Sequence, residues 1–392
     1  MSSKRRPELQ EFVCNGDRIF TGLCTGVRKE RMTIMNNSKR IYVDFHVLQT
    51  VPPSCVNRDD TGSPKTAIYG GVTRARVSSQ AWKRAMRLKF QDILSQEDVG
   101  QRTKMVIDLV AGQIIALDPE CTEKQAQDSA KKVLEAAGVK VKEDKNQLKT
   151  GALFFISPGQ IHQLAEIAAR QEKAPNKTEC KEALKARPSV DLALFGRMVA
   201  DDPGLNFDAA AQVAHAISTH AIENEFDYFT AVDDCAPEDN AGAGHLGTVE
   251  FNSSTLYRYA TVNVEDLKKM LGEATPEAVR AFAEAFIRSM PTGKQNTFAN
   301  WTRPDVVYVA VRRDQPINMA GAFEKPVRAG NEGYVANSAK ALAAYADETY
   351  RDFAAAPELS LTVGKGLESL AEPCSVDALL NTLEAWLKGE IK

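Results

Sequence analysis

The chain has 392 residues, of which 43% are hydrophobic and 26% are charged, and its formal net charge is −3. This length allows a large core and two or three compact units, and the composition is ordinary for a globular protein. The overall charge gives no reason to expect a polyanionic partner, so a nucleic-acid site would have to come from local clustering of charge.

Seven cysteines are scattered along the chain without a CxxC pair. This argues against a disulfide framework or a zinc knuckle and favours a reducing cytoplasm. No apolar run approaches the roughly 18–20 residues that span a bilayer, so we expect a cytoplasmic protein without membrane contact. Residues 1–37 are polar and lack the apolar segment of a secretory signal. Either these residues are a flexible extension, or translation begins within them, at Met32 or Met35.

The first regular element is Ile41–Gln49, whose β-rich composition predicts a strand. After a loop rich in proline and glycine, a helix begins near Ser78 or Ser79, either of which can cap it. Its apolar stripe consists of Trp82, Ala85, Met86, Phe90 and Ile93.

Residues from about 95 to 190 differ from what precedes them. Three helical patterns, at 103–117, 122–138 and 157–173, are broken by glycine and proline, and Pro158 after Ser157 is a favourable helix start. This region is predicted to be a helical insertion.

The rest of the chain alternates between strands and helices. Residues 212–222 are ambiguous and favour a strand, and 223–250 are an acidic connector with aromatic residues. A strand at Thr255–Val264, a helix at about 276–289, a strand at Asp305–Arg313 and a helix pair within 335–388 follow. Without the two excursions the order is βαββαβ, the ferredoxin-like order. RNA-recognition modules, whose sheet faces stack bases, share it with many unrelated proteins.

Positive charge gathers between Arg58 and Gln91, where eight Lys and Arg residues stand against Asp59 and Asp60. Such a cluster can neutralise the phosphates of a nucleic acid whatever its base sequence. A solvent-exposed helix face on an ordinary protein would carry a similar cluster. From charge alone the two interpretations are about equally supported. The cations are Arg58, Lys65, Arg74, Arg76, Lys83, Arg84, Arg87 and Lys89.

Other candidate residues have plainer interpretations. Asp59 and Asp60 could act as an acid/base pair, but they more often cap a turn. His215, His220 and His245 could bind metal, but the spacing of the first two suits neither a helix face nor a strand face. Satisfied histidines near a core or an RNA path are the favoured interpretation.

The aromatic residues Phe226, Tyr228 and Phe229 could belong to a core or stack on bases. The loop 291–304 carries Lys294 and Gln295 as plausible nucleic-acid contacts, although a simple connection is slightly favoured. No Walker A, GxGxxG or GxSxG motif is present, so we expect no catalytic residue, cofactor or metal.

The block HVLQTVPPSCVNRDDTGSPKTAIYGGVTRARVSSQAWKRAMR resembles the N-terminal signature of the CasC family, the backbone subunit of the type I-E Cascade CRISPR surveillance complex. The resemblance continues through LALFGRMVAD, AHAISTHAIENEFDYFTAVDD, AGAGHLGTVEFNSSTLYRYATVNV, GKQNTFAN and PINMAGAFEKPV. Several motifs in the same order make it specific, and it covers residues 41 to 330 apart from a divergent helical part.

The resemblance implies an α+β hand: a ferredoxin-like, RNA-recognition-motif-like palm with helical fingers and a thumb hairpin. The implied boundaries are 38–94 for the first part of the palm, 95–194 for the fingers, 195–222 for palm, 223–250 for the thumb, and 251–392 for the second part of the palm with C-terminal helices.

By motif, the resemblance places Arg58, Lys65, Ser79, Gln80, Lys83 and Arg87 at the RNA backbone. Met198 corresponds to a methionine that inserts at a kinked nucleotide, and Phe195 beside it stands where a small polar residue is common. Phe229 and Leu246 fall near the displaced nucleotide. Arg74, Arg76, Lys294 and Gln295 complete the candidate RNA contacts.

The implied function is a non-enzymatic scaffold that binds CRISPR RNA. Its copies would form a filament along the guide, together with other Cascade subunits, and target DNA would be read through guide pairing. One alternative is an endoribonuclease that processes CRISPR RNA through His46, His215 or His220. Another is a metabolic enzyme whose basic patch binds a phosphorylated small molecule.

Overall fold

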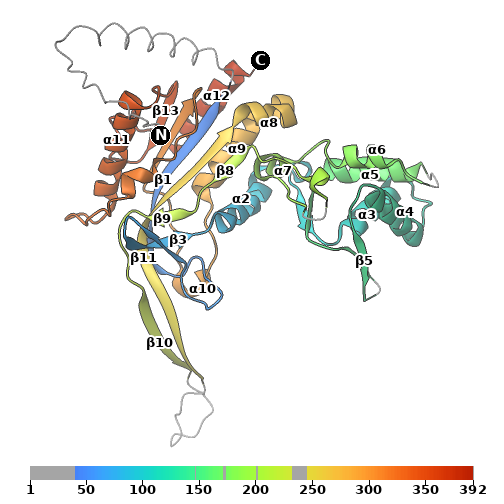
Figure 1. Cartoon of the computed structure of the whole chain (residues 1–392), viewed down its shortest axis with the longest axis horizontal. Coiled ribbons are helices and arrows are strands. Elements are labelled where there is room, and N and C mark those ends of the chain that lie inside the picture. Colours follow the sequence, from blue (N-terminus) through green and yellow to red (C-terminus); the bar gives the residue numbers. More distant parts are fainter. Residues whose placement is uncertain (1–39, 146, 171–173, 200–201, 232–244, 392) are drawn as a thin grey trace, which may run out of the picture. The chain divides into compact units, whose positions relative to one another are not determined.

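The computed structural model describes residues 40–391 with gaps at 146, 171–173, 200–201 and 232–244, and without the side chains of His245 and Leu246. The predicted extension 1–37 and the middle of the predicted thumb lie outside the described residues. The described chain combines helices with an antiparallel sheet (Figure 1). This confirms the predicted α+β class.

One large antiparallel sheet organises the molecule, with the strand order β13-β12-β1-β11-β9-β3-β2. The strand β8 also pairs with β11, and β10 pairs with the part of β11 that lies beyond β1. The bounds are β1 Tyr42–Ser54, β2 Thr66–Tyr69, β3 Val72–Val77, β8 Ala211–Val213, β9 Ala216–Ser218, β10 Glu225–Ala231, β11 His245–Asn263, β12 Val306–Arg312 and β13 Leu359–Val363.

The sheet buries one face under helices. Alternation along β1 directs Val43, Phe45 and Val47 to this face, where they join one hydrophobic core with α2, α9 and α12 (Figure 1). The helices α7 and α8 contribute to the same core. The bounds are α2 Ser79–Ile93, α7 Val190–Phe195, α8 Val264–Leu271, α9 Thr275–Arg288 and α12 Val376–Glu390.

The opposite face of the sheet is covered as well. Here His46 and three tyrosines of β11 and β12 are buried beneath η5, Met319–Phe323, and α11, Val335–Asp352. The tyrosines are Tyr257, Tyr259 and Tyr308. These rings occupy the kind of sheet face on which RNA-recognition modules stack bases. Burial makes them unavailable to bases in this chain.

The region 95–190 forms a helical layer with a core of its own. The three predicted helices are confirmed as α3 Val106–Leu117, α4 Glu123–Ala136 and α5 Pro158–Ala169, and α6 Lys177–Ala183 is added. Ser157 caps α5 through a reciprocal capping box with Gln160. The region also holds two short strand pairs that were not predicted, β4 Gln101–Thr103 with β7 Phe154–Ile156, and β5 Val141–Asp144 with β6 Gln147–Thr150.

The strand interpretation of 212–222 is confirmed in part: the backbone forms β8 and β9 on either side of Ala214 and His215, while residues 219–222 are not in a strand. The C-terminal helix pair is also confirmed, while the edge strand β13 between its two members was not predicted. Of the helices in the described ranges, none has both the length and the apolar character needed to cross a membrane.

Candidate nucleic-acid interface

The loop that joins β1 to β2 is fixed by its own polar groups. The Asp59 carboxylate accepts hydrogen bonds from the backbone N–H groups of Thr61 and Ser63, each at 3.0 Å. Together with the Thr61 hydroxyl, which is the largest cause, these bonds hold the pKa of Asp59 below its usual value. Asp59 therefore caps a turn, and its neighbour Arg58 is exposed at the surface.

The same loop is tied to the start of α2. The Asn57 side-chain oxygen accepts from the backbone N–H of Ser78 at 2.9 Å, and the Ser78 hydroxyl accepts from Ala81 N–H. Ser78 is therefore the cap of the helix. The first turn, beginning with Ser79 and Gln80, consists of uncharged side chains, so nothing on the helix offsets the positive end of its dipole.

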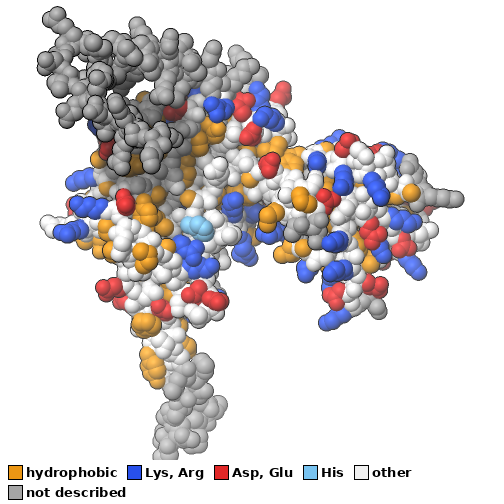
Figure 2. All heavy atoms as spheres, viewed as in Figure 1, with side chains coloured by type: hydrophobic (Ala, Val, Ile, Leu, Met, Phe, Trp, Pro, Cys, Tyr) orange, Lys and Arg blue, Asp and Glu red, His pale blue; other side chains and the backbone are white. Residues whose placement is uncertain are grey.

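Two cations and a histidine lie at this helix end. Arg76 Nε donates to the Thr66 carbonyl at 3.2 Å, and Arg76 Nη1 lies 3.4 Å from His215 Nδ1. The Ser79 N–H donates to the same Nδ1 at 3.2 Å. Burial lowers the pKa of His215, and the charges of Arg76 and Lys65 lower it further. Figure 2 shows Lys and Arg side chains gathered beside a histidine on one face.

One turn further along α2, Lys83 and Arg84 extend the positive surface. Burial lowers the pKa of Lys83, whose Nζ lies 5.5 Å from the centre of the Phe195 ring. Arg84 is exposed and, with Arg58, lines a groove of about 530 Å³ between the loop and the helix. Ala81, Ala85, Leu88, Met290 and Pro291 give the groove an apolar lining.

The predicted contacts Lys294 and Gln295 lie against the same loop. A side chain at Gly293 would come within 2.0 Å of the Val56 carbonyl oxygen, so only glycine fits there. Lys294 follows with φ +48° and precedes α10, Gln295–Phe298. Lys294 and Arg58 both oppose the upward shift that burial causes in the pKa of Cys55. The two cations therefore share one neighbourhood.

We call the following set the cationic edge: Arg58, Lys65, Arg76, Lys83, Arg84 and Lys294, with Ser79, Gln80 and Gln295.

Arg74 is a correction to the predicted set. Its side chain is fully buried, and its nitrogens donate to the backbone carbonyls of Tyr69, Ser218 and Phe323 at 3.1, 2.9 and 2.8 Å. The guanidinium joins three segments of the chain, and its burial keeps it out of reach of a ligand. We therefore remove Arg74 from the candidate RNA contacts.

Arg87 also has a structural partner. Its Nε forms a 3.0 Å ion pair with the fully buried carboxylate of Asp191 in α7, and its Nη2 donates to the Gly100 carbonyl. The guanidinium also lies 4.2 Å from the centre of the Phe155 ring. Because the pair bridges α2 and the helical insertion, changing Arg87 would disturb the fold and would not test RNA binding cleanly.

Met198 projects from a rigid turn and is 85% exposed. Gly196 before it has φ +71°, and a side chain there would come within 2.6 Å of the Phe207 carbonyl oxygen. Arg197 is buried and donates to the carbonyls of Phe155, Leu184 and Leu205. Phe195, which stands where a small polar residue is common in CasC proteins, packs against Phe90 and Phe282. The turn therefore holds the apolar side chain of Met198 exposed to solvent.

The strands β10 and β11 form an antiparallel hairpin in which every residue of β10 is exposed. Phe226 and Tyr228 are 70% and 64% exposed, and Phe229 is 40% exposed. The Phe229 ring lies over Gly247, where a side chain would come within 2.4 Å of it. The backbone of Leu246 pairs with Thr230, while its side chain lies outside the described residues.

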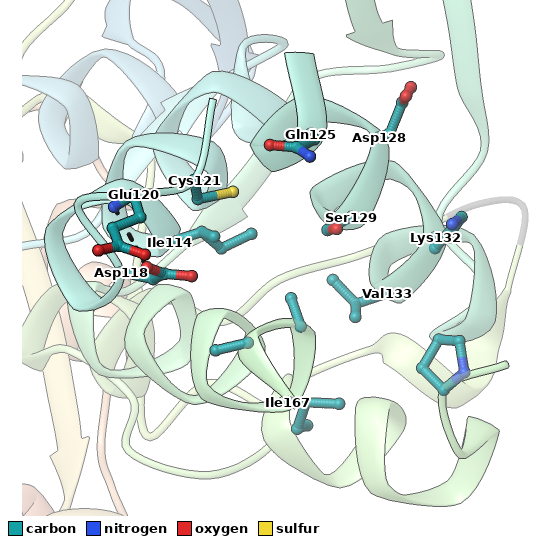
Figure 3. A pocket seen from close by; sticks show the side chains of 13 residues that line it. Ile114, Asp118, Glu120, Cys121, Gln125, Asp128, Ser129, Lys132, Val133 and Ile167 are labelled. Carbon is teal, nitrogen blue, oxygen red and sulfur yellow. Dashed lines mark hydrogen bonds between the residues drawn. The ribbon is translucent and has the colours of Figure 1, made fainter. Parts of the chain in front are cut away.

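A second cavity, of about 480 Å³, lies between α3, α4 and α5 in the helical insertion (Figure 3). Its lining mixes the acidic Asp118, Glu120 and Asp128 with Lys132 and apolar side chains. In the part of the chain that the structure describes, no group of three or more His, Cys, Asp or Glu side chains could hold a metal ion.

Comparisons with solved structures and with family models show which proteins the chain is similar to. A chain of a solved structure described as "CRISPR RNA-guided surveillance complex, pre-nicking" aligns with a TM-score of 0.76 and 35% identity, over 88% of this chain and 99% of that one. A chain of a "CRISPR RNA-guided surveillance complex" aligns with a TM-score of 0.66 and 29% identity, over 87% and 99%. No curated protein matches. A family model described as CT1975-like protein matches residues 43–387.

The chain belongs to the CT1975-like protein family. The resemblance to CasC subunits that the sequence motifs indicated is thereby confirmed. In this CT1975-like protein, the sequence suggested His215 as a metal ligand, a catalytic residue or a histidine near a core or an RNA path, but it was not chosen as an RNA contact. Its place beside α2 follows from the pairing of β9 with β3, which the sequence does not reveal. Arg84 was counted among the cations, but it was not chosen as a contact.

Proposed function

We propose that this CT1975-like protein is a non-catalytic subunit of a CRISPR RNA-guided surveillance complex of the Cascade type, where it binds the CRISPR RNA. The proposal rests on 35% identity over 99% of a chain from a complex of that description. The cationic edge gives the proposal a physical basis, because Lys and Arg neutralise phosphates without reading the bases.

The sheet supports the assignment of a palm that resembles an RNA-recognition module. The order β12-β1-β11-β8/β9 places the fourth, first, third and second strands of a βαββαβ chain side by side, as in a ferredoxin-like fold. However, η5 and α11 cover the face that such modules use for stacking. We therefore propose that the RNA follows the cationic edge and does not lie on the sheet.

The fingers and the thumb belong to the same proposal. The helical insertion would be the fingers, and the β10–β11 hairpin with its exposed aromatic side chains would be the thumb. Met198 and Phe229 would contact the strand where it kinks. Copies would stack along the guide, and the exposed guide bases would pair with target DNA. A near-neutral net charge favours such stacking, because strongly basic copies would repel one another.

The histidines give limited support to a processing endoribonuclease. His46 and His220 are buried, with 1% and 5% of their surfaces exposed. The His220 ring stacks on Tyr334 with the ring centres 3.6 Å apart. His215 is exposed, but its Nδ1 already accepts a backbone hydrogen bond. This environment favours a binding role over an acid–base pair.

Expression of the chain with a CRISPR array and the neighbouring genes tests the proposal. We expect CRISPR RNA and the partner subunits to copurify with the chain and the guide RNA to remain intact. Incubation of the purified chain with precursor RNA distinguishes the alternative, since specific cleavage that is lost on changing a histidine would favour a nuclease. Purification of the chain without RNA or partners would contradict the proposal.

A further inference from the structure

We propose that His215 is a further RNA-binding residue, which presents a neutral Nε2–H donor to a phosphate oxygen at the cationic edge. This inference rests on the proposed function, because the phosphate is that of the bound RNA. It assigns His215 a role different from metal binding or acid–base chemistry.

The hydrogen bonds of the ring fix its tautomer. Nδ1 accepts from the Ser79 backbone N–H at 3.2 Å and lies 3.4 Å from the Arg76 guanidinium. Both groups are donors only, so Nδ1 must carry a lone pair and the ring proton must sit on Nε2. Within the described chain Nε2 has no hydrogen-bond partner, and the residue is exposed at the surface. The ring is thus an oriented donor directed away from its own helix cap.

The charges around the ring favour an anion. Arg76 from β3 and Lys65 from the loop before β2 are the charged groups that act on His215, and Ser79 contributes the positive end of α2. Burial, followed by the charges of Arg76 and Lys65, lowers the pKa of His215, and the two donors that face Nδ1 oppose protonation of that nitrogen. Phosphate oxygens are the acceptors that such a set of donors suits.

A neutral donor has a measurable signature that separates it from the lysines and arginines nearby. Each cation that neutralises a phosphate contributes to the salt dependence of binding, with a slope of about −0.7 per contact on a single strand. A hydrogen bond from neutral His215 strengthens binding without contributing to that slope. Loss of the bond should weaken binding roughly tenfold, as expected for a hydrogen bond to a charged acceptor.

Two substitutions separate the nitrogens of the ring. In His215→Asn the amide oxygen can replace Nδ1 as the acceptor for Ser79, but the side chain is too short to replace Nε2. In His215→Gln the side-chain amide nitrogen reaches the position of Nε2, while the acceptor for Ser79 is lost. The full chain with each substitution is titrated into fluorescein-labelled oligouridine at several salt concentrations, and its thermal stability is measured.

The expected result is roughly tenfold weaker binding for His215→Asn, with an unchanged salt slope and melting temperature. His215→Gln should retain most of the affinity while melting at a lower temperature. Wild-type affinity in His215→Asn would overturn the inference and leave the proposed function intact. The same holds if only His215→Gln loses affinity, because His215 would then act only as a helix cap. If the wild-type chain does not bind RNA at all, the proposed function itself fails.

Discussion

Arg87 and Asp191 form a 3.0 Å ion pair in which the carboxylate is fully buried and the arginine side chain is 23% exposed. Asp191 also accepts from the Gly100 N–H and the Ser189 hydroxyl, each at 2.8 Å. One carboxylate therefore connects α2, α7 and the entry to the helical insertion. The positive charge at Arg87, which the sequence indicated as an RNA contact, is neutralised within the fold.

Replacement of Arg87 by alanine should destabilise the protein by about 2–4 kcal/mol, since it leaves a buried carboxylate without its counter-charge. Urea denaturation measures the loss. The control is Arg84→Ala, an exposed residue of the same helix, which should change stability by about 0.5 kcal/mol or less. Equal stability of the two variants would show that the ion pair does not hold the helices together.

Lys65→Ala should weaken RNA binding without unfolding the protein. Removal of one phosphate contact is expected to reduce the salt slope by about 0.7, and fluorescence anisotropy at several salt concentrations measures both affinity and slope. The contrasting variant is Arg74→Ala. It leaves buried backbone carbonyls without donors, so it should lower stability first. An unchanged slope in Lys65→Ala would remove that lysine from the cationic edge.

Local patterns made much of the fold predictable. The stripe Trp82, Met86 and Phe90 indicated which face of α2 is buried, and the pair Ser78 and Ser79 indicated where the helix begins, with Ser78 as the cap in the structure. The β-rich run at the start of β1 likewise identified a strand, since side-chain alternation and strand propensity act over a few residues.

Other features depended on partners that are distant in the sequence. Arg74 is buried because the carbonyls of Ser218 and Phe323 reach it, and Arg258 is buried against the Trp82 ring, 3.7 Å from its centre. An arginine at a surface and one solvated by carbonyls look alike in sequence, so counting charges overestimated the number of cations available to RNA. The covering of the sheet by η5 and α11 likewise depends on packing between segments that are distant in the sequence.

Asp44 and His46 lie on the covered face of β1 and should influence stability in opposite directions on acidification. Burial raises the pKa of Asp44 to about 6, while burial and the charge of Arg312 lower the pKa of His46 to about 3. Asp44 takes up a proton in the folded state between about pH 6 and 4, which stabilises the fold. His46 resists protonation from about pH 6.5 downward, which destabilises it.

The variant Asp44→Asn should therefore lose stability more steeply than the wild type between pH 6.5 and 4, and His46→Asn should lose it less steeply. Each difference should amount to about 2–3 kcal/mol at most, from 1.36 kcal/mol per pKa unit. Chemical denaturation at a series of pH values measures how the free energy of unfolding of each protein changes with pH. A loss of packing that is the same at every pH does not affect this comparison. Parallel curves for all three proteins would show that neither group titrates differently on folding.

Met198 offers a test of the proposed kink in the RNA. The side chain is 85% exposed, so Met198→Ala should leave stability within about 0.5 kcal/mol of the wild type. If the methionine inserts between bases, the variant should reduce the fluorescence increase of a 2-aminopurine placed in the guide, because that base stays stacked. Phe353→Ala is a matched control, since Phe353 is 77% exposed and ends α11 outside the cationic edge. Equal fluorescence in both variants would mean that Met198 does not separate bases, and that the rigid turn of Gly196 and Arg197 holds it out for a different contact.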